Sequence, residues 1–362
     1  MSIESDLKKD GITVIEPLDT TTVNVIAKNV SKKIVAAFSN FGFDFYTLYE
    51  RFSKLPMYIA DMPEGMSEAS YFYKNSAIYF RDGMGLADLE KFSVHELIHN
   101  FQEQKNEKGD LTRLGLCTFK GSKPTGMALN EAAVQLLASN ILENTFETAT
   151  YYDITFSTVS PNCYPLLCNL IYQMAYVTGE EVLFESTFNS NDHFKNKFTA
   201  LCGENVYNQI SNYFDKILET EEKIIKISNK IQKNELSTAK VDSLYKKSDE
   251  LKKQLKSACF STQELIINSY FTNSLKTLIT SDDVDIFRKK LYSFQDIIGT
   301  TTNYFFFNNY YIQVMEKLDS RYDSLSDYLD DDNTYLIPKK ENKFTKIINY
   351  IKKLIWKKES VR

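Results

Sequence analysis

Two histidines four residues apart constrain this chain more than any other feature of its sequence. His95 and His99 frame the pentapeptide His-Glu-Leu-Ile-His, in which Glu96 follows the first histidine. The chain has three histidines in 362 residues, so this one motif holds two of the three. On a helix, positions i and i+4 lie on one face, one turn apart, and both imidazoles can therefore reach a single metal ion.

The glutamate between the histidines has a different place on the helix. Glu96 lies at a neighbouring position, where its carboxylate can hold a water molecule rather than the metal. This is the arrangement of zinc-dependent hydrolases, so we interpret His95 and His99 as ligands of Zn2+ and Glu96 as the catalytic base. The alternative is a helix whose histidines are ordinary surface groups or hydrogen-bonded core groups.

A second helical stretch supplies a third candidate ligand. Residues 126–138 are apolar and helix-forming, yet they carry Glu131 in their interior. A buried unpaired carboxylate is costly, and metal coordination removes that cost. The alternative is a half-exposed glutamate near a helix N-terminus, where the helix dipole favours negative charge. Given the upstream motif, we predict that Glu131 is a metal ligand.

The motif helix followed by Asn130-Glu131 on a later helix resembles the pattern of the gluzincins, the thermolysin-like HExxH zinc metallopeptidases. The resemblance covers about residues 69–140 and is specific only in those motifs. It implies that His95, His99 and Glu131 bind zinc and that Glu96 is the general base. It also implies a small sheet before the motif helix, whose edge strand can pair with an extended peptide substrate.

The chain departs from the thermolysin-like pattern in two ways. The gap between His99 and Glu131 holds 31 residues, more than the commonest gluzincin spacings. Four residues after Glu131 stands Gln135, where the thermolysin-like pattern has an aspartate that orients a histidine. The carbonyl oxygen of Gln135 could accept the same imidazole N–H, but without charge. No third histidine follows at short spacing, so the metzincin pattern is not met.

A gluzincin also needs a histidine or tyrosine that stabilises the oxyanion. The candidates are His193, Tyr151, Tyr152 and Tyr164, and we take His193 and Tyr152 as the catalytic residues to accompany Glu96. For His193, which follows an Asn-Asp pair, the alternative is a place in a surface helix cap. For the tyrosines the alternative is packing, because the chain has 23 of them.

Periodicity predicts an α+β fold that is mostly helical, with a small zincin-like sheet and active-site helices followed by a helical C-terminal region. Strand-like runs at 12–15 and 55–60 and a hairpin at 69–80 precede the motif helix. Residues 105–126 are punctuated by Gly, Asn and Pro, so we expect an irregular segment there.

We expect three parts along the chain. Residues 1–140 form the zincin-like N-terminal part, residues 141–335 form a helical part that completes the cleft, and residues 336–362 form a tail. Within the second part, residues 205–258 carry isoleucine and leucine at helical spacing on two arms, which predicts an antiparallel helical hairpin. Partner binding and a purely scaffolding role are both open for this hairpin.

The C-terminal tail differs from the rest in charge. Residues 339–362 carry nine Lys or Arg against two Glu, whereas the whole chain has a net charge of −5. Apolar residues from Phe344 to Trp356 recur at helical spacing, so the tail suits an anionic membrane surface or an acidic partner. The alternative is a tail that docks on its own acidic body. The acidic remainder argues against nucleic acid as a partner.

The five cysteines are odd in number, scattered and without a CxxC pair, which favours reduced thiols. The first ten residues have no apolar signal core, and no apolar run approaches the length of a membrane span. We therefore expect a cytoplasmic protein, with its tail as a peripheral contact at the inner membrane surface.

Two functions remain open at this stage. The first is a zinc metallopeptidase that hydrolyses peptide bonds in a peptide or protein substrate. The alternative is a non-catalytic helical interaction protein with a structural or vestigial zinc site, tethered to a membrane surface by its basic tail.

Overall fold

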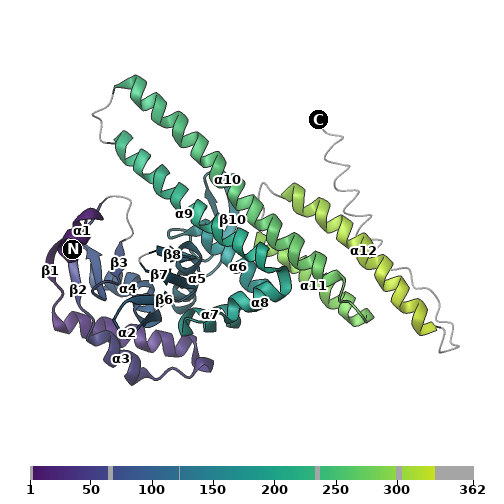
Figure 1. Ribbon diagram of the computed structural model, residues 1–362, viewed down its shortest axis with the longest axis horizontal. Coiled ribbons are helices and arrows are strands. Elements are labelled where there is room, and N and C mark those ends of the chain that lie inside the picture. The colour runs from purple at the N-terminus through teal and green to yellow at the C-terminus, as the bar shows by residue number, and fades with distance from the viewer. Residues whose placement is uncertain (1–2, 64–67, 122, 233–236, 299–303, 331–362) are drawn as a thin grey trace.

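The computed structural model describes residues 3–63, 68–121, 123–232, 237–298 and 304–330. Within them the fold is α+β and mostly helical, as the sequence predicts. Figure 1 shows the small sheet and the helices beside it at one end of the molecule, and long helices leading away from them.

The first sheet has four strands in the order β1-β2-β4-β3. β2 and β4 pair in parallel, whereas β1 and β3 pair antiparallel to them on the outside. The three predicted strand regions are therefore present, and the edge near the motif helix is β3. The strands are β1 (Thr13–Pro17), β2 (Met57–Asp61), β3 (Ala69–Phe72) and β4 (Ala77–Arg81), and the helices around them are α1 (Ile3–Lys9), α2 (Thr20–Ala37) and α3 (Phe45–Ser53).

The sheet leads into α4 (Leu86–Gln102), which carries the HExxH motif. α4 packs against α2 on one side and against α5 (Met127–Ile141) on another. α5 is buried along nearly its whole length, because Ala, Leu and Val occupy almost every turn. The motif helix is thus enclosed between the sheet and two other helices, which fixes its side chains in place.

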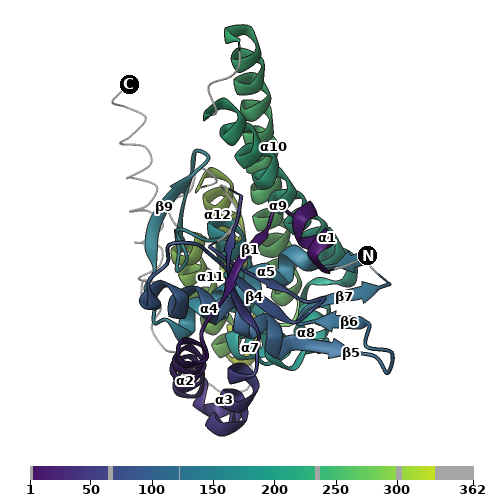
Figure 2. The ribbon, with the colours of Figure 1, turned by 90° about the vertical axis from the view of Figure 1, so that its left-hand side faces the viewer.

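The sequence predicts an irregular segment at 105–126, but the structure shows strands there. With the end of α4 these residues form an antiparallel sheet of short strands, β5 (Glu103–Lys105), β6 (Leu111–Leu114), β7 (Cys117–Lys120) and β8 (Lys123–Thr125). Gly109, Gly115 and Gly121 occupy the turns between the strands, whereas Gly126 precedes α5, so the glycine spacing marks hairpins rather than a loop. Figure 2 shows this sheet projecting from the side of the molecule.

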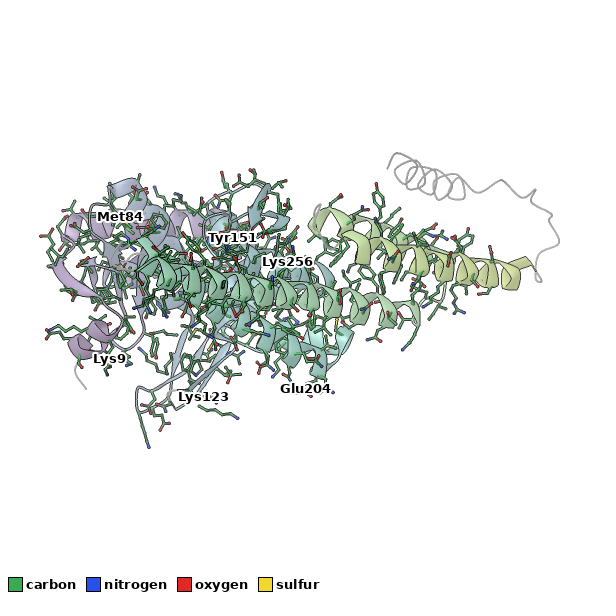
Figure 3. The ribbon with its side chains drawn as sticks, turned by 90° about the horizontal axis from the view of Figure 1, so that it is seen from above. Lys9, Met84, Lys123, Tyr151, Glu204 and Lys256 are labelled. Atoms are coloured by element: carbon green, nitrogen blue, oxygen red, sulfur yellow. The ribbon has the colours of Figure 1, made fainter. Side chains whose placement is uncertain are left out.

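A second hairpin was also missed, in a region expected to be helical. It consists of β9 (Glu147–Tyr151) and β10 (Ile154–Thr158). Tyr152 and Asp153 form its turn with φ of 50° and 61°, the left-handed conformation of a two-residue hairpin loop. Lys256 lies beside Tyr151 (Figure 3) and donates to the carbonyl oxygen of Asp153 at 3.2 Å.

The remainder is helical, and α9 with α10 forms the predicted antiparallel hairpin, whose far end extends away from the body (Figures 1 and 2). α10 continues beyond the predicted limit to Leu275. Ile217 and Ile224 from one arm join Leu251 and Leu255 from the other in the main core. The helices are α6 (Pro165–Thr178), α7 (Glu180–Asn189), α8 (His193–Cys202), α9 (Glu204–Gln232), α10 (Thr238–Leu275), α11 (Ser281–Ile298) and α12 (Tyr304–Asp330).

All five cysteines are free thiols, and four of them are buried. Among the helices that the structure describes, none combines the length and the apolar character needed to span a bilayer. The basic tail predicted at 336–362 lies outside the described residues.

One carboxyl group in α9 is buried without a counter-charge. Glu221 is 5% exposed, and its Oε1 has no hydrogen-bond partner in the described part of the chain. Burial raises the pKa of Glu221 to about 8, so the folded protein holds this side chain protonated at neutral pH.

This burial predicts a pH-dependent stability. Between the ordinary pKa of 4.5 and the folded value of about 8, the unfolded state releases a proton that the folded state keeps. The free energy of unfolding therefore falls as pH rises through this window, by up to about 5 kcal/mol. Glu221→Gln removes that dependence, so the variant is the more stable protein at pH 9 and gains little at pH 4.5. Denaturant unfolding across this pH range measures the effect.

The matched control is Glu222→Gln, because Glu222 is exposed on the same helix and pairs with Lys226 at 3.3 Å. We expect its stability to follow the wild type at each pH. Identical pH profiles for wild type and Glu221→Gln would contradict the prediction.

Candidate metal centre

α4 and α5 bring three metal-binding side chains together. The Nε2 atoms of His95 and His99 are 3.0 Å apart. The oxygens of Glu131, on α5, lie 3.2 Å from Nε2 of His95 and 3.3 Å from Nε2 of His99. The donor atoms of these three residues all lie within 4.8 Å of one another, so the predicted ligands form a group that could hold a metal ion.

The spacing of the three donors suits a tetrahedral site. Around zinc, with bonds of about 2.0–2.1 Å, neighbouring ligand atoms of a tetrahedron lie about 3.3 Å apart. The two Nε2 atoms are 3.0 Å apart, and each lies 3.2–3.3 Å from a different oxygen of Glu131. Two imidazoles and one carboxylate are also the donor set of catalytic zinc sites that keep a fourth position open. The residues therefore fit zinc in both chemistry and spacing.

Gln135 orients one of the imidazoles. Its Oε1 lies 2.8 Å from Nδ1 of His95, and its amide nitrogen donates to Oγ of Ser160 at 3.0 Å. An amide oxygen can only accept, so Nδ1 of His95 carries a proton, and Nε2 is the nitrogen free to bind a metal. Gln135 thus does what the aspartate of the thermolysin-like pattern does, without its charge. His99 has no such partner in the described chain, and its ring stacks on Tyr71 instead.

The carboxylates of Glu131 and Glu96 favour a positive charge among these side chains. Burial lowers the pKa of His95, but its contacts with Glu131 and Glu96 outweigh burial and raise that pKa to about 9. For Glu131, burial acts to raise the pKa, yet His99 and His95 hold it well below its usual range. The carboxylate therefore stays ionised, and a metal ion that binds displaces the proton from Nε2 of His95.

Glu96 lies beside the cluster rather than in it. Its side chain is buried, and its Oε2 accepts a hydrogen bond of 2.7 Å from the backbone N–H of Tyr71 in β3. Burial raises the pKa of Glu96, and the neighbouring histidines oppose that rise. One carboxylate oxygen is thus fixed by the edge strand, while Oε1 remains for a different partner. Glu96 therefore lies next to the three donors without belonging to the group that could hold a metal ion.

A cavity of about 630 Å³ opens beside these residues. Its walls come from β3, the motif helix, α5 and the segment that precedes α6. Sites for small ligands and substrates typically have about 300–1,000 Å³. The volume is therefore sufficient for several residues of an extended peptide.

Of the four predicted oxyanion donors, Tyr164 lines this cavity. Its ring centroid lies 6.2 Å from that of His95. Tyr164 begins α6 with φ of 48°, an uncommon conformation for a non-glycine residue. Burial raises the pKa of its phenol well above the usual value, so the hydroxyl keeps its proton and remains a donor.

The structure does not bring His193 and Tyr152 to the cluster, and neither lines the cavity. His193 is half-exposed at the start of α8, where its Nδ1 lies 3.2 Å from Glu185 and its backbone N–H donates to Asn191. Tyr152 belongs to the β9–β10 turn and packs on Tyr151, with ring centroids 4.2 Å apart. His193 therefore has a structural place at the start of α8, after an Asn-Asp pair, and Tyr152 has one in the turn between β9 and β10.

Sequence analysis missed the residues that hold the edge strand against α4. The hydroxyl of Tyr71 accepts from Nδ2 of Asn100 at 3.2 Å. Arg51 of α3 donates to Oδ1 of the same asparagine at 2.9 Å and to its backbone oxygen. The sequence signal that could have pointed to this network is Asn100, a polar residue directly after the motif. In the structure Asn100 is buried, with 6% of its surface exposed.

A second missed network joins the end of α4 to the start of α5. Nδ2 of Asn130 donates to Oε1 of Gln102 at 3.3 Å, and Oδ1 of Asn130 accepts from the backbone N–H of Leu116 at 2.9 Å. Gln102 in turn donates to the backbone oxygen of Thr187 at 2.9 Å. Asn130 and Gln102 are almost completely buried. This network sets the position of Glu131, which follows Asn130.

Comparison with known proteins identifies no relative of this chain. No protein-family model, no curated protein and no solved structure matches the chain. The argument for function therefore rests on the geometry of the site.

The geometry predicts how zinc affinity responds to two substitutions on α5. Glu131→Ala removes a ligand, and we expect it to abolish stoichiometric zinc binding. Gln135→Leu leaves all three ligands but frees the ring of His95, so we expect affinity to fall about 10–100-fold. Competition with a chromophoric chelator measures both effects.

Gln209→Leu is the control, because Gln209 is exposed on α9 and should leave affinity unchanged. Full zinc content in Glu131→Ala would remove this residue from the ligand set. Wild-type affinity in Gln135→Leu would show that the hydrogen bond to His95 does not support the metal.

Proposed function

We propose that this protein is a zinc-dependent peptidase. The observation that carries the proposal is the placement of Glu96 in the same cavity as three convergent metal donors. A structural zinc site is closed by four protein ligands and needs neither a cavity nor a nearby base. The donor set of His95, His99 and Glu131 with an adjacent buried carboxylate supports hydrolysis over a purely structural role.

Bound zinc would supply Lewis acidity, which polarises a carbonyl and lowers the pKa of a water molecule to about 7. Glu96 takes a proton from the attacking water through Oε1 and then delivers it to the leaving amine. The hydrogen bond from Tyr71 N–H to Oε2 keeps the carboxylate oriented through both transfers. Burial of Glu96 keeps its pKa above that of a free glutamate, which favours proton uptake.

The edge strand supports a peptide as the substrate. Residues 68–71 of β3 and its approach line the cavity beside the metal donors. Among the described residues β3 pairs with no strand other than β4, so its other edge is open, and the strand lines the cavity. An extended peptide can add to such an edge through backbone hydrogen bonds, with its scissile carbonyl held near the metal.

Tyr164 is the donor that we assign to the oxyanion. Its hydroxyl stays protonated, and it lines the cavity near His95. A donor fixed before the reaction stabilises the charge that develops on the carbonyl oxygen. The start of α6, with Pro165 as its first residue, holds the backbone of Tyr164 in place.

We also propose that the protein acts in a reducing compartment, the cytoplasm. Its five free cysteines support this assignment. Contact of residues 339–362 with a membrane surface or an acidic partner remains a prediction from sequence.

Glu96→Gln separates catalysis from metal binding. The amide cannot take a proton but preserves size and can still meet Tyr71, so we expect normal zinc content and peptide hydrolysis reduced at least about 1,000-fold. Turnover of a peptide library and metal analysis are measured on the same preparation. A Glu96→Gln protein as active as the wild type would refute the proposed mechanism. Zinc-loaded wild type that cuts no peptide would favour the non-catalytic alternative.

Tyr164→Phe tests the oxyanion donor. We expect kcat to fall about 100–1,000-fold with little change in KM, because the lost hydrogen bond acts on the transition state. The controls are Tyr152→Phe and His193→Ala, which alter the two candidates that lie away from the cavity and should leave kcat unchanged. If either control loses activity while Tyr164→Phe keeps it, the assignment is wrong.

A further inference from the structure

Beyond the metal donors, the lining of the cavity continues along α4 and α5, and we call this part of the cavity its arm. The two helices are antiparallel, since Gln102 contacts Asn130, His95 contacts Gln135, and Glu131 lies between these contacts. Moving from His95 toward the start of α4 therefore means moving from Gln135 toward the end of α5. Both helices continue to line the cavity in this direction.

The walls of this arm are apolar and its end is positively charged. The arm is lined by Phe92 from α4, by Ala138 from α5, by Leu142 directly after α5, and by Lys91, which is exposed. The ammonium of Lys91 lies 5.4 Å from the centroid of the Phe92 ring, a cation–π contact that keeps the lysine at this end of the arm. Asn144 contributes an uncharged amide beside it.

The other charged groups in the lining already have roles. Glu68 is 2.9 Å from Arg81, Glu131 belongs to the metal donors, and Glu96 bonds to the edge strand. Lys91 forms no salt bridge with any residue that the structure describes, and no other lysine or arginine lines the cavity there. The arm therefore offers a peptide one cation that no carboxylate of the described residues neutralises.

We propose that Lys91 binds a carboxylate of the peptide substrate, on a residue near the scissile bond. This inference rests on the proposed peptidase function and adds a preference for substrates with a negative charge. Lys91 stands one helical turn, about 6 Å along the axis, from His95. An extended peptide advances about 3.3 Å per residue, and the lysine side chain adds its own reach, so the carboxylate lies within about three residues of the cut.

Two sources could supply this carboxylate, the side chain of Asp or Glu and the C-terminus of a short peptide. The ammonium of Lys91 recognises both in the same way. Peptides that carry Glu or Gln at each of the three positions flanking the cut, each as a free acid and as a C-terminal amide, distinguish the sources.

The experiment measures kcat/KM of the zinc-loaded full chain on these peptides. We expect the carboxylate form to be preferred about tenfold over its neutral partner, the size of one charge-assisted hydrogen bond. In Lys91→Met, which keeps an apolar stem over Phe92, the ratio should fall to about one. Lys91→Arg should restore it. The control is Lys33→Met, an exposed lysine of α2, which should keep both the ratio and the zinc content of the wild type.

The outcomes separate this inference from the function beneath it. If no peptide is cut by zinc-loaded protein, the proposed function and this inference both fail. If peptides are cut without a carboxylate preference, or if the preference survives in Lys91→Met, the peptidase remains and the role of Lys91 is refuted. A binding measurement on Glu96→Gln with the same peptide pairs gives a second readout that does not depend on turnover.

Discussion

The buried hydrogen bond between Gln102 and Asn130 is the interaction on which the site depends. The two histidines are one turn apart on α4 and need only that helix to converge. Glu131 comes from another helix, separated from His99 by 31 residues, and reaches them only if α4 and α5 keep one register. A buried amide network enforces such a register, because a slip would leave its polar groups unsatisfied. Gly115 belongs to the same constraint, since a Cβ there would fall 2.1 Å from Oδ1 of Asn130, and its φ of 55° favours glycine.

The second constraint on the site is the contact between the edge strand β3 and α4. Tyr71 reaches α4 in three ways: its backbone N–H meets Glu96, its ring stacks on His99, and its hydroxyl meets Asn100. Because Arg51 also bonds to Asn100, β3, α4 and α3 are joined around Glu96. Glu96 and the metal donors are thus positioned by separate networks, one at the sheet and one at the start of α5. Loss of one network should therefore disturb one function of the site more than the other.

The sequence was sufficient for the parts of this molecule that depend on local spacing. The i, i+4 histidines, the helix around Glu131, the strands before the motif and the α9–α10 hairpin all follow from periodicity, and all are present. It was insufficient where strands are short, with three or four residues in β5 to β8 and five in each arm of the β9–β10 hairpin, because such strands leave little periodic pattern. It was also insufficient for the choice among Tyr152, Tyr164 and His193, because that choice depends on which loop folds over the cavity. Asn100 and Tyr71 could not be singled out either, since their partners lie on elements distant in the sequence.

Gln135 stands where the gluzincin pattern has an aspartate, and this difference changes the charge of the cavity. An aspartate at this position would add a negative charge beside His95, whereas Gln135 orients the same ring as a neutral acceptor. With a divalent cation held by two neutral imidazoles and Glu131, the centre is one unit more positive than it would be with that aspartate. Lys91 adds a further positive charge in the arm of the same cavity. Both features change the field in the same direction, and in a cavity with low-dielectric walls such a field favours substrates that carry a carboxylate.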